Sequence, residues 1–135
     1  MTADELSAHY RGYLDCLNRQ DWTRLGDFVH AQVRHNDRPL GLDGYREMLE
    51  GDFAAIPDLS FQAELQACEP PVVASRLTFD CTPIGELFGL PVNGRRVRFS
   101  EHVFYRFQDG RIIRVWSLID RAAIQAQLSQ PASSP

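Results

Sequence analysis

Apolar residues recur at helical spacing in the first half of the chain, and this pattern predicts three helices. The first has an apolar side made of Leu6, Tyr10, Tyr13, Leu14 and Leu17. Thr2 and Glu5 can form a capping box in front of it. Asp21 can cap a second, short helix whose apolar side is Trp22, Leu25, Phe28 and Val29. The third helix begins at Asp43 and is ended by Pro57, with an apolar side of Tyr45, Met48, Leu49, Phe53 and Ile56.

Extended segments dominate the second half, where apolar and polar residues alternate. A short extended segment at residues 32–36 comes earlier, between the second and third helices. Strands are predicted at 61–65 and 72–81, followed by a glycine- and proline-containing loop at 82–94. Residues 99–120 predict a long hairpin, because β-branched and aromatic residues flank a Gln108-Asp109-Gly110 turn. Asp120 is expected to cap a last helix that ends at Leu128, and residues 129–135 are expected to be disordered.

This order of elements, helices first and a mostly antiparallel sheet afterwards, is typical of an α+β fold. The sheet must curl over the helices to bury both apolar faces. A pocket between the first helix, the third helix and the concave face of the sheet is then the expected site for a small ligand. The 135 residues, 44% hydrophobic and 24% charged, are expected to form a single domain over residues 1–128.

Composition narrows the possible partners and locations. The net charge of -4 argues against nucleic acid or an anionic membrane surface as a partner. No stretch approaches the roughly 18 apolar residues of a membrane span, and the acidic start of the chain does not fit a signal peptide, so a cytoplasmic location is expected. Cys16, Cys68 and Cys81 are expected to be buried, reduced thiols. The histidines lack metal-ligand spacing and no glycine-rich phosphate loop occurs, so neither a metal nor another cofactor is indicated.

The hairpin at 99–120, the segment at 35–46 and the helix end Ile56-Pro57-Asp58-Leu59 together resemble the SnoaL-like polyketide cyclases, also called ester cyclases. That family belongs to the NTF2-like superfamily, and the likeness spans residues 6–128. It implies a cone-shaped fold in which three helices pack on a curved sheet, with a further helix at the C-terminus. It also implies a homodimer, for which Trp116, Phe104 and Val97 are candidates on the outer face of the sheet.

The resemblance places the chemistry of these cyclases on the second strand of the hairpin. There the family usually has an Asp directly after a Trp, and this Asp is the acid/base for an aldol ring closure. The present chain reads Val115-Trp116-Ser117, so the expected carboxylate is a serine. The partner histidine of the cyclases falls on Val103. Because a serine hydroxyl needs a neighbouring base before it can act as one, the aldol activity is not transferred as it stands.

Three other residues can take part in proton transfer. Strand alternation puts Glu101 on the same face as Val103, where burial would raise its pKa toward the range of a general base; alternatively it reaches solvent or pairs with a nearby arginine. His35 falls where the related ketosteroid isomerases keep their catalytic base, and Tyr13 matches their oxyanion tyrosine. The alternatives are that Tyr13 is a core aromatic residue and that His35 forms a polar loop with Asn36 and Asp37.

Arg76 and Trp116 are candidate ligand contacts that can instead have a structural role on the surface. Arg76 matches part of an Arg-x-Asp motif of the epoxide hydrolases, but an inward guanidinium would need an anionic partner, and an outward, solvated side chain is the more frequent case. Trp116 lies one residue off the strand face that holds Ser117, so it is either a ligand contact or a packing residue at a dimer face.

The leading hypothesis is a small enzyme that moves a proton on a hydrophobic carbonyl compound without a cofactor, in a cyclisation or an isomerisation. His35 or Glu101 is the base, and Tyr13 or Ser117 donates a hydrogen bond to the oxyanion. Contacts with the ligand are expected from Asn36, Asp37, Arg76, Val103, Val115 and Trp116. The alternative is a binding module of the same fold without catalysis, which the loss of the cyclase Asp favours. An enzyme requires Glu101 and His35 to point into one enclosed pocket.

Overall fold

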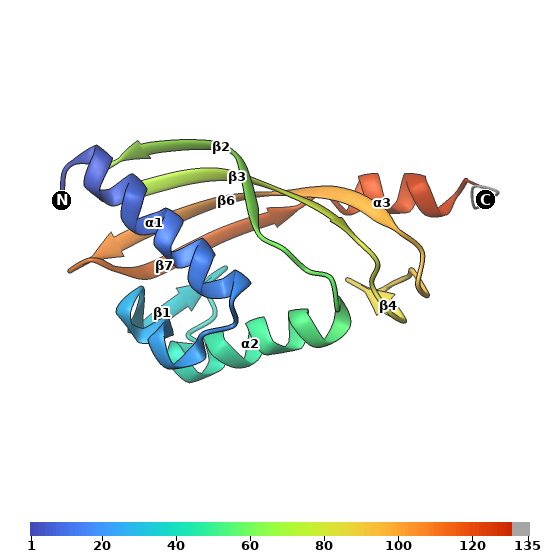
Figure 1. Cartoon of the computed structure of the whole chain (residues 1–135), viewed down its shortest axis with the longest axis horizontal. Helices are drawn as coiled ribbons and strands as arrows, with labels where there is room; N and C mark the ends of the chain where they lie inside the picture. Colours follow the sequence, from blue (N-terminus) through green and yellow to red (C-terminus); the bar gives the residue numbers. More distant parts are fainter. Residues whose placement is uncertain (131–135) are drawn as a thin grey trace.

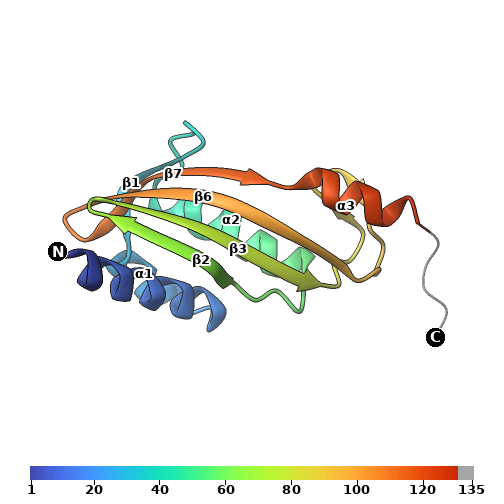
Figure 2. The ribbon, with the colours of Figure 1, turned by 90° about the horizontal axis from the view of Figure 1, so that it is seen from above.

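The computed structural model describes residues 1–130 and has the α+β architecture that the sequence predicts (Figure 1). A curved sheet of five strands has the order β1-β7-β6-β3-β2, and only the β1–β7 pair is parallel. The strands are β1 (Val29–His35), β2 (Gln62–Glu69), β3 (Val72–Cys81), β6 (Val97–Gln108) and β7 (Arg111–Ile119). Helices α1 (Ala3–Asn18) and α2 (Gly41–Ala55) lie on the same side of this sheet, and α3 (Arg121–Leu128) extends beyond its end (Figure 2).

Helix α1 begins with the predicted capping box. The Thr2 hydroxyl accepts a hydrogen bond from the backbone N–H of Glu5 at 3.1 Å, and the Glu5 carboxylate accepts one from the backbone N–H of Thr2 at 2.9 Å. Two amide groups that lack helical partners are thereby satisfied. The predicted apolar side is buried against the sheet, so Tyr10 and Tyr13 reach the interior.

The segment after α1 differs from the prediction in two ways. The second helix is a 3₁₀ turn, η1 (Trp22–Asp27), and Asp21 does not cap its backbone but accepts a hydrogen bond from the Thr23 hydroxyl. Val29 does not extend the helix, because it already pairs with Ile112 at the start of β1. Pairing with β7 therefore outweighs the local helical pattern, and the strand ends at His35, one residue earlier than expected.

Helix α2 begins two residues before the expected Asp43 and stops before Pro57. Its inner side carries the buried residues Tyr45 and Leu49, and Ile56, directly after the helix, is buried on the same side. These residues are separated by four and seven positions, as one side of an α-helix requires. The same side includes Asp52, a position that the sequence pattern did not single out.

The sheet strands alternate as expected on β6 but not on β2. Val97, Glu101 and Tyr105 share the inner face of β6, whereas Phe104 is 51% exposed on the outer face. Val97 is therefore a core residue, which corrects its expected place on the outer face. Strand β2 is an edge strand with a bulge between Ala63 and Leu65, and Leu65 is 63% exposed. The hairpin turns at Asp109 and Gly110, whose φ angles of 54° and 74° fit a type I′ turn.

Residues 82–94 contain a small hairpin rather than an open loop. Strands β4 (Glu86–Leu87) and β5 (Leu90–Pro91) pair in it, and the side chains of Leu87 and Val92 are buried. The hairpin tip presents Phe88, whose ring meets Phe99 edge-on at 6.0 Å. This segment therefore closes one end of the interior.

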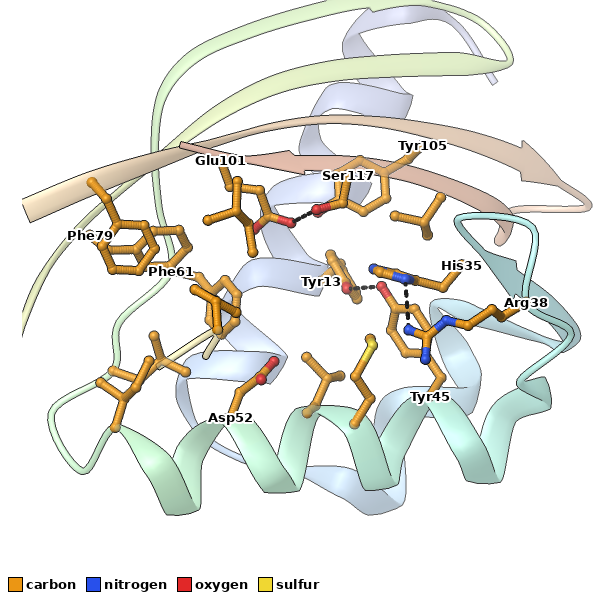
Figure 3. A pocket seen from close by; sticks show the side chains of 18 residues that line it. Tyr13, His35, Arg38, Tyr45, Asp52, Phe61, Phe79, Glu101, Tyr105 and Ser117 are labelled. Atoms are coloured by element: carbon orange, nitrogen blue, oxygen red, sulfur yellow. Dashed lines mark hydrogen bonds between the residues drawn. The ribbon is translucent and has the colours of Figure 1, made fainter. Parts of the chain in front are cut away.

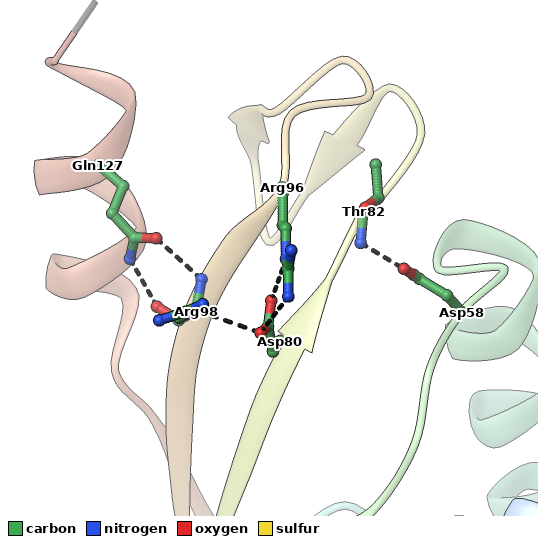
Figure 4. A network of polar contacts seen from close by, with 6 residues as sticks. All are labelled: Asp58, Asp80, Thr82, Arg96, Arg98 and Gln127. Atoms are coloured by element: carbon green, nitrogen blue, oxygen red, sulfur yellow. Dashed lines mark hydrogen bonds and ion pairs between the residues drawn. The ribbon is translucent and has the colours of Figure 1, made fainter. Parts of the chain in front are cut away.

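Polar contacts hold α3 against the sheet (Figure 4). Asp120 caps the helix as predicted, because its carboxylate accepts a hydrogen bond from the backbone N–H of Ala123 at 3.1 Å. The Gln127 amide exchanges two hydrogen bonds with the backbone of Arg98. Asp80 pairs with Arg96 at 2.6 Å and with Arg98 at 3.2 Å, and so joins β3 to β6. These contacts hold together α3 and the end of the sheet where β3 stops and β6 begins.

Three further expectations concern the tail, the cysteines and the membrane. Ser129 and Gln130 are bonded through their backbone N–H groups to the last turn of α3, so these two residues of the expected disordered tail are ordered. Residues 131–135 lie outside the part that the structure describes, and their disorder stays a prediction. The cysteines are free thiols; Cys16 and Cys81 are buried, whereas Cys68 is partly exposed. Within residues 1–130, no helix has the length and apolar character needed to cross a membrane.

Candidate functional site

A cavity of about 230 Å³ lies between α1, α2 and the inner face of the sheet (Figure 3). Most of its wall is apolar, with contributions from Met48, Leu49, Ile56, Leu59, Phe61, Phe79, Phe88, Phe99, Val115 and Ile119. Its polar wall residues are Tyr13, His35, Arg38, Tyr45, Asp52, Glu101, Tyr105 and Ser117. A mainly apolar cavity with a few convergent polar groups is the usual form of a small-molecule site.

Glu101 and Ser117 form a hydrogen-bonded pair on the sheet wall. They come from neighbouring strands, β6 and β7, and the Ser117 hydroxyl donates to the Glu101 carboxylate. Burial raises the pKa of Glu101, and the hydrogen bond from Ser117 partly offsets this rise. Ser117, which stands where the cyclases have an aspartate, therefore donates its proton to Glu101. Glu101 lies two residues before Val103, the residue directly opposite Ser117 on β6, and its carboxylate faces the cavity.

Asp52 faces the cavity from the opposite wall, on α2 (Figure 3). Burial, followed by the negative charge of Glu101, raises its pKa from 3.8 to about 6. Within residues 1–130, no group donates a hydrogen bond to the Asp52 carboxylate. The cavity therefore has two carboxyl groups on facing walls, both with a raised pKa.

Tyr13 and Tyr45 join α1 to α2 inside the cavity. Their hydroxyl oxygens are 2.7 Å apart, and both side chains are buried. Burial raises the pKa of each phenol well above its usual value, so both stay protonated at neutral pH. Only one of the two protons lies between the oxygens. The other is available to a ligand, as an oxyanion donor requires.

His35 lines the cavity at the end of β1, beside Arg38. The Arg38 guanidinium lies 3.4 Å from His35 Nδ1, and a guanidinium can only donate hydrogen bonds, so Nδ1 is the acceptor. The ring proton is therefore on Nε2, which points toward the cavity (Figure 3). Burial and the positive charge of Arg38 lower the pKa of His35, which keeps the ring neutral at pH 7. His35 is thus better suited to donate a hydrogen bond than to accept a proton.

The structure brings five of the ten predicted site residues to the cavity: Tyr13, His35, Glu101, Val115 and Ser117. Val103 faces inward as expected but is a core residue that does not line the cavity. The other four lie outside it, because the turn after β1 and the outer sheet face direct them elsewhere. Their interactions show a structural role for each.

Asn36 and Asp37 have φ angles of 47° and 66°, which turn the chain away from the cavity after His35. The Asn36 amide binds the backbone N–H and C=O of Ser117 at 2.8 and 3.1 Å, and so holds β1 against β7. The Asp37 carboxylate pairs with Arg114 at 2.8 Å on the surface. These two residues position the strand ends rather than contact a ligand in the cavity.

Arg76 and Trp116 lie on the outer face of the sheet. Arg76 pairs with Glu64 at 3.1 Å and also contacts His102. Of the two alternatives for Arg76, the structure therefore has the outward, solvated side chain. The Arg114 guanidinium lies 5.1 Å from the centre of the Trp116 ring, which is 37% exposed. Neither side chain reaches the cavity, so the structure does not bring these two expected ligand contacts to it.

Sequence reasoning missed Asp52, Tyr45 and Arg38 as wall residues. Asp52 had a readable signal, since it lies seven residues after Tyr45 and four before Ile56, and so interrupts an otherwise apolar helix side with a carboxylate. The helical pattern predicts Tyr45 only as a core residue. The sequence offered no signal for Arg38, because its place depends on the turn after His35.

Comparison with known proteins places the chain in a family. The sequence profile of the SnoaL-like polyketide cyclases matches residues 7–128. The structure is similar to that of a SnoaL-like polyketide cyclase from Agrobacterium tumefaciens str. C58, with 53% identity and a TM-score of 0.92 over 96% of this chain and 100% of that one. No functionally curated protein matches the sequence.

More distant structures share the fold. AclR of Streptomyces galilaeus, provisionally assigned as a hydroxylase, is 24% identical with a TM-score of 0.77 over 96% of this chain and all of that one. IdmH of Streptomyces antibioticus, provisionally assigned as a polyketide cyclase, is 21% identical with a TM-score of 0.79 over 93% of this chain and 99% of that one. The fold is the NTF2-like cone that the resemblance implied, and the chain belongs to the SnoaL-like polyketide cyclase family.

Proposed function

We propose that this protein binds a small aromatic carbonyl compound and moves a proton on it without a cofactor, as a step of a cyclisation or an isomerisation. The observation that carries the proposal is the pair of carboxyl groups, Glu101 and Asp52, on facing walls of one mainly apolar cavity. Burying two like charges together costs stability. A site that only carried an apolar ligand would gain nothing from them.

Glu101 is the base of the proposed reaction. Its carboxylate removes a proton from the carbon next to the ligand's carbonyl group, and the electron pair of that C–H bond passes to the carbonyl oxygen as an enolate. The free proton of the Tyr13–Tyr45 pair and the Nε2–H of His35 donate hydrogen bonds to this oxygen. Ser117 positions Glu101 and stabilises its ionised form, which opposes the rise in the pKa of Glu101 that burial causes.

Asp52 completes the proton balance. In an isomerisation, protonated Glu101 returns its proton to another carbon of the enolate. In a ring closure, the enolate carbon forms a bond to a second carbonyl carbon of the same molecule, and the resulting alkoxide takes a proton from the Asp52 carboxyl group. A pKa of about 6 lies close enough to neutral pH for such a transfer.

The cavity limits the ligand to one or two rings. An engineered cavity of about 150 Å³ holds benzene, and the cavity here measures about 230 Å³. The phenylalanine side chains of the wall suit an aromatic ring.

Hydrogen exchange tests the proposed function without knowledge of the natural substrate. 2-Tetralone, a bicyclic aromatic ketone, is incubated with the protein in D₂O, and loss of the proton signals next to the carbonyl is followed by NMR. Glu101→Gln is expected to lower the protein-dependent exchange rate at least about a hundredfold, as for loss of a general base. Glu64→Gln, which removes a surface carboxylate on β2, is the matched control.

Each outcome of this assay is informative. Exchange that depends on Glu101 and not on Glu64 supports the proposal. If 2-tetralone and related ketones bind in the cavity but exchange no faster than in buffer, the protein is a binding module. That result would contradict the catalytic proposal, and the serine at position 117 would then mark a lost activity.

We also propose that the protein is a homodimer whose two copies pair through the outer face of the sheet. A cytoplasmic location, which the sequence suggests, is proposed as well. Exposed apolar side chains gather there: Leu118 is 74% exposed, Phe104 51% and Trp116 37%. Phe104 and Trp116 are direct cross-strand neighbours, so their rings form one patch. Contiguous exposed apolar surface of this kind favours an interface.

A further inference from the structure

The two ends of the cavity differ in chemistry. At one end, Phe79 stacks on Phe99 with ring centres 5.0 Å apart, and Phe61 meets Phe79 edge-on at 5.6 Å. Phe88 adds a fourth ring from the β4–β5 hairpin. At the other end lie His35, Arg38 and Tyr45, with Glu101 and Asp52 between the two ends (Figure 3).

Arg38 supplies an uncommitted positive charge at the polar end. Among residues 1–130 its guanidinium has no carboxylate partner, and its side chain makes one hydrogen bond, to His35 Nδ1. The neighbouring acidic residue, Asp37, does not pair with Arg38, because its carboxylate binds Arg114 and its backbone C=O accepts a hydrogen bond from Arg34. Most of the five N–H donors of Arg38 are therefore free to bind a ligand.

The donors at this end suit a planar anion. Two parallel N–H groups of a guanidinium match the two oxygens of a carboxylate, and the Nε2–H of the neutral His35 lies on the same side of the cavity. Further inside, the carboxyl groups of Glu101 and Asp52 repel a negative charge. An anionic group on the ligand is thus favoured beside Arg38 and disfavoured in the middle of the cavity.

We propose that the ligand is an aromatic carboxylic acid, whose ring packs among the phenylalanines while its carboxylate binds Arg38. The inference takes the cavity as the ligand site, as the proposed function does, and adds the substrate class. A ligand held at both ends presents its central atoms to Glu101 and Asp52. For the proposed reaction, the carbonyl group and its acidic C–H therefore lie between the ring and the carboxylate, as in an aromatic keto acid.

Binding of a matched acid and amide tests this inference. The dissociation constants of 2-naphthoate and 2-naphthamide, which have the same ring and nearly the same shape, are measured by calorimetry at pH 8 and 0.15 M salt. The acid is expected to bind at least about tenfold more tightly, as for one charge-assisted pair at a partly exposed site. Arg38→Gln is expected to abolish this preference by weakening the acid alone, and Arg38→Lys to keep part of it.

Control variants separate a charge effect at Arg38 from a general one. Arg11→Gln removes an exposed arginine of α1 that does not line the cavity, and it is expected to keep the tenfold preference. Urea unfolding of each variant shows that the fold is intact. Equal binding of acid and amide to the wild-type protein contradicts the inference. So does a preference that survives Arg38→Gln, or failure of both probes to bind at millimolar concentration.

A second measurement distinguishes failure of this inference from failure of the proposed function. Glu101→Gln is expected to keep the preference for the acid while it loses 2-tetralone exchange. If the wild-type protein prefers the acid but exchanges no proton, the substrate class stands and the catalytic proposal fails. If exchange occurs and the preference is absent, the catalytic proposal stands and the carboxylate site fails.

Discussion

Replacing Asp52 with asparagine is expected to make the protein more stable and less active. The carboxyl group has a pKa of about 6 in the folded protein and an ordinary value of 3.8, so the folded state binds this proton more tightly than the unfolded state. The stabilising effect of protonation is complete below pH 3.8 and is lost as the pH rises through 6. The difference of about 2 pH units corresponds to about 3 kcal/mol of unfolding free energy.

Asparagine has nearly the shape of a protonated aspartate and carries no charge. Asp52→Asn should therefore be up to about 3 kcal/mol more stable than the wild-type protein at pH 8, and about equally stable at pH 4. Urea unfolding at the two pH values measures both differences. Glu47→Gln, on the exposed side of the same helix, is the control and is expected to change stability by less than about 0.5 kcal/mol.

Two results would refute the reasoning about Asp52. A gain in stability that is the same at pH 4 and pH 8 would show that the buried charge is not its cause. A loss of stability at pH 8 would show that the Asp52 carboxylate stabilises the fold instead. If the predicted gain is accompanied by slower ring closure or slower proton exchange, the carboxylate is retained for its chemistry at the expense of stability.

Three further predictions concern the other walls and the outer face. Ser117→Ala removes the hydrogen-bond donor to Glu101, so the pKa of Glu101 is expected to increase. The exchange rate should then reach its maximum at a higher pH than in the wild-type protein, and an unchanged pH profile would contradict this. Tyr13→Phe is expected to lower the exchange rate by roughly 10²-fold, and Tyr45→Phe is measured for comparison. Unchanged exchange rates in both variants would show that neither phenol contacts the oxyanion. Trp116→Glu should convert a dimer into monomers in sedimentation velocity, while equal sedimentation of both proteins would exclude this face as the interface.

Strand alternation made part of the sheet wall of the site predictable. The period of two in β6 puts Glu101 on the inner face, whereas the inward place of Ser117 is expected from the resemblance to the cyclases and depends on a bulge in β7. The Asp-Gly turn alone would pair Ser117 with His102 on the outer face, and the extra residue Ile113 in β7 moves Ser117 opposite Val103 instead. The sequence predicts Ser117 as a donor to the oxyanion; that its hydroxyl donates to Glu101 instead depends on rotamers that no sequence pattern fixes.

The residues around His35 show where sequence reasoning fails. Asn36 and Asp37 follow a candidate site residue directly, yet their positive φ angles turn them outward, and Arg38 comes back to the cavity. Proximity in sequence is therefore a poor guide across a tight turn. Asp52 is hard to recognise for another reason, because the apolar residues of an amphipathic helix define its inner side and a carboxylate among them leaves that pattern unchanged.

A crystal structure with 2-tetralone bound tests the central claim most directly. The account predicts the ring beside Phe79 and Phe99, the carbonyl oxygen within about 3.2 Å of Tyr13 Oη or His35 Nε2, and the neighbouring carbon facing the Glu101 carboxylate. A ketone that lies in the cavity with its acidic carbon turned away from both carboxyl groups would contradict proton transfer at this site. So would a ketone that binds only on the outer face of the sheet.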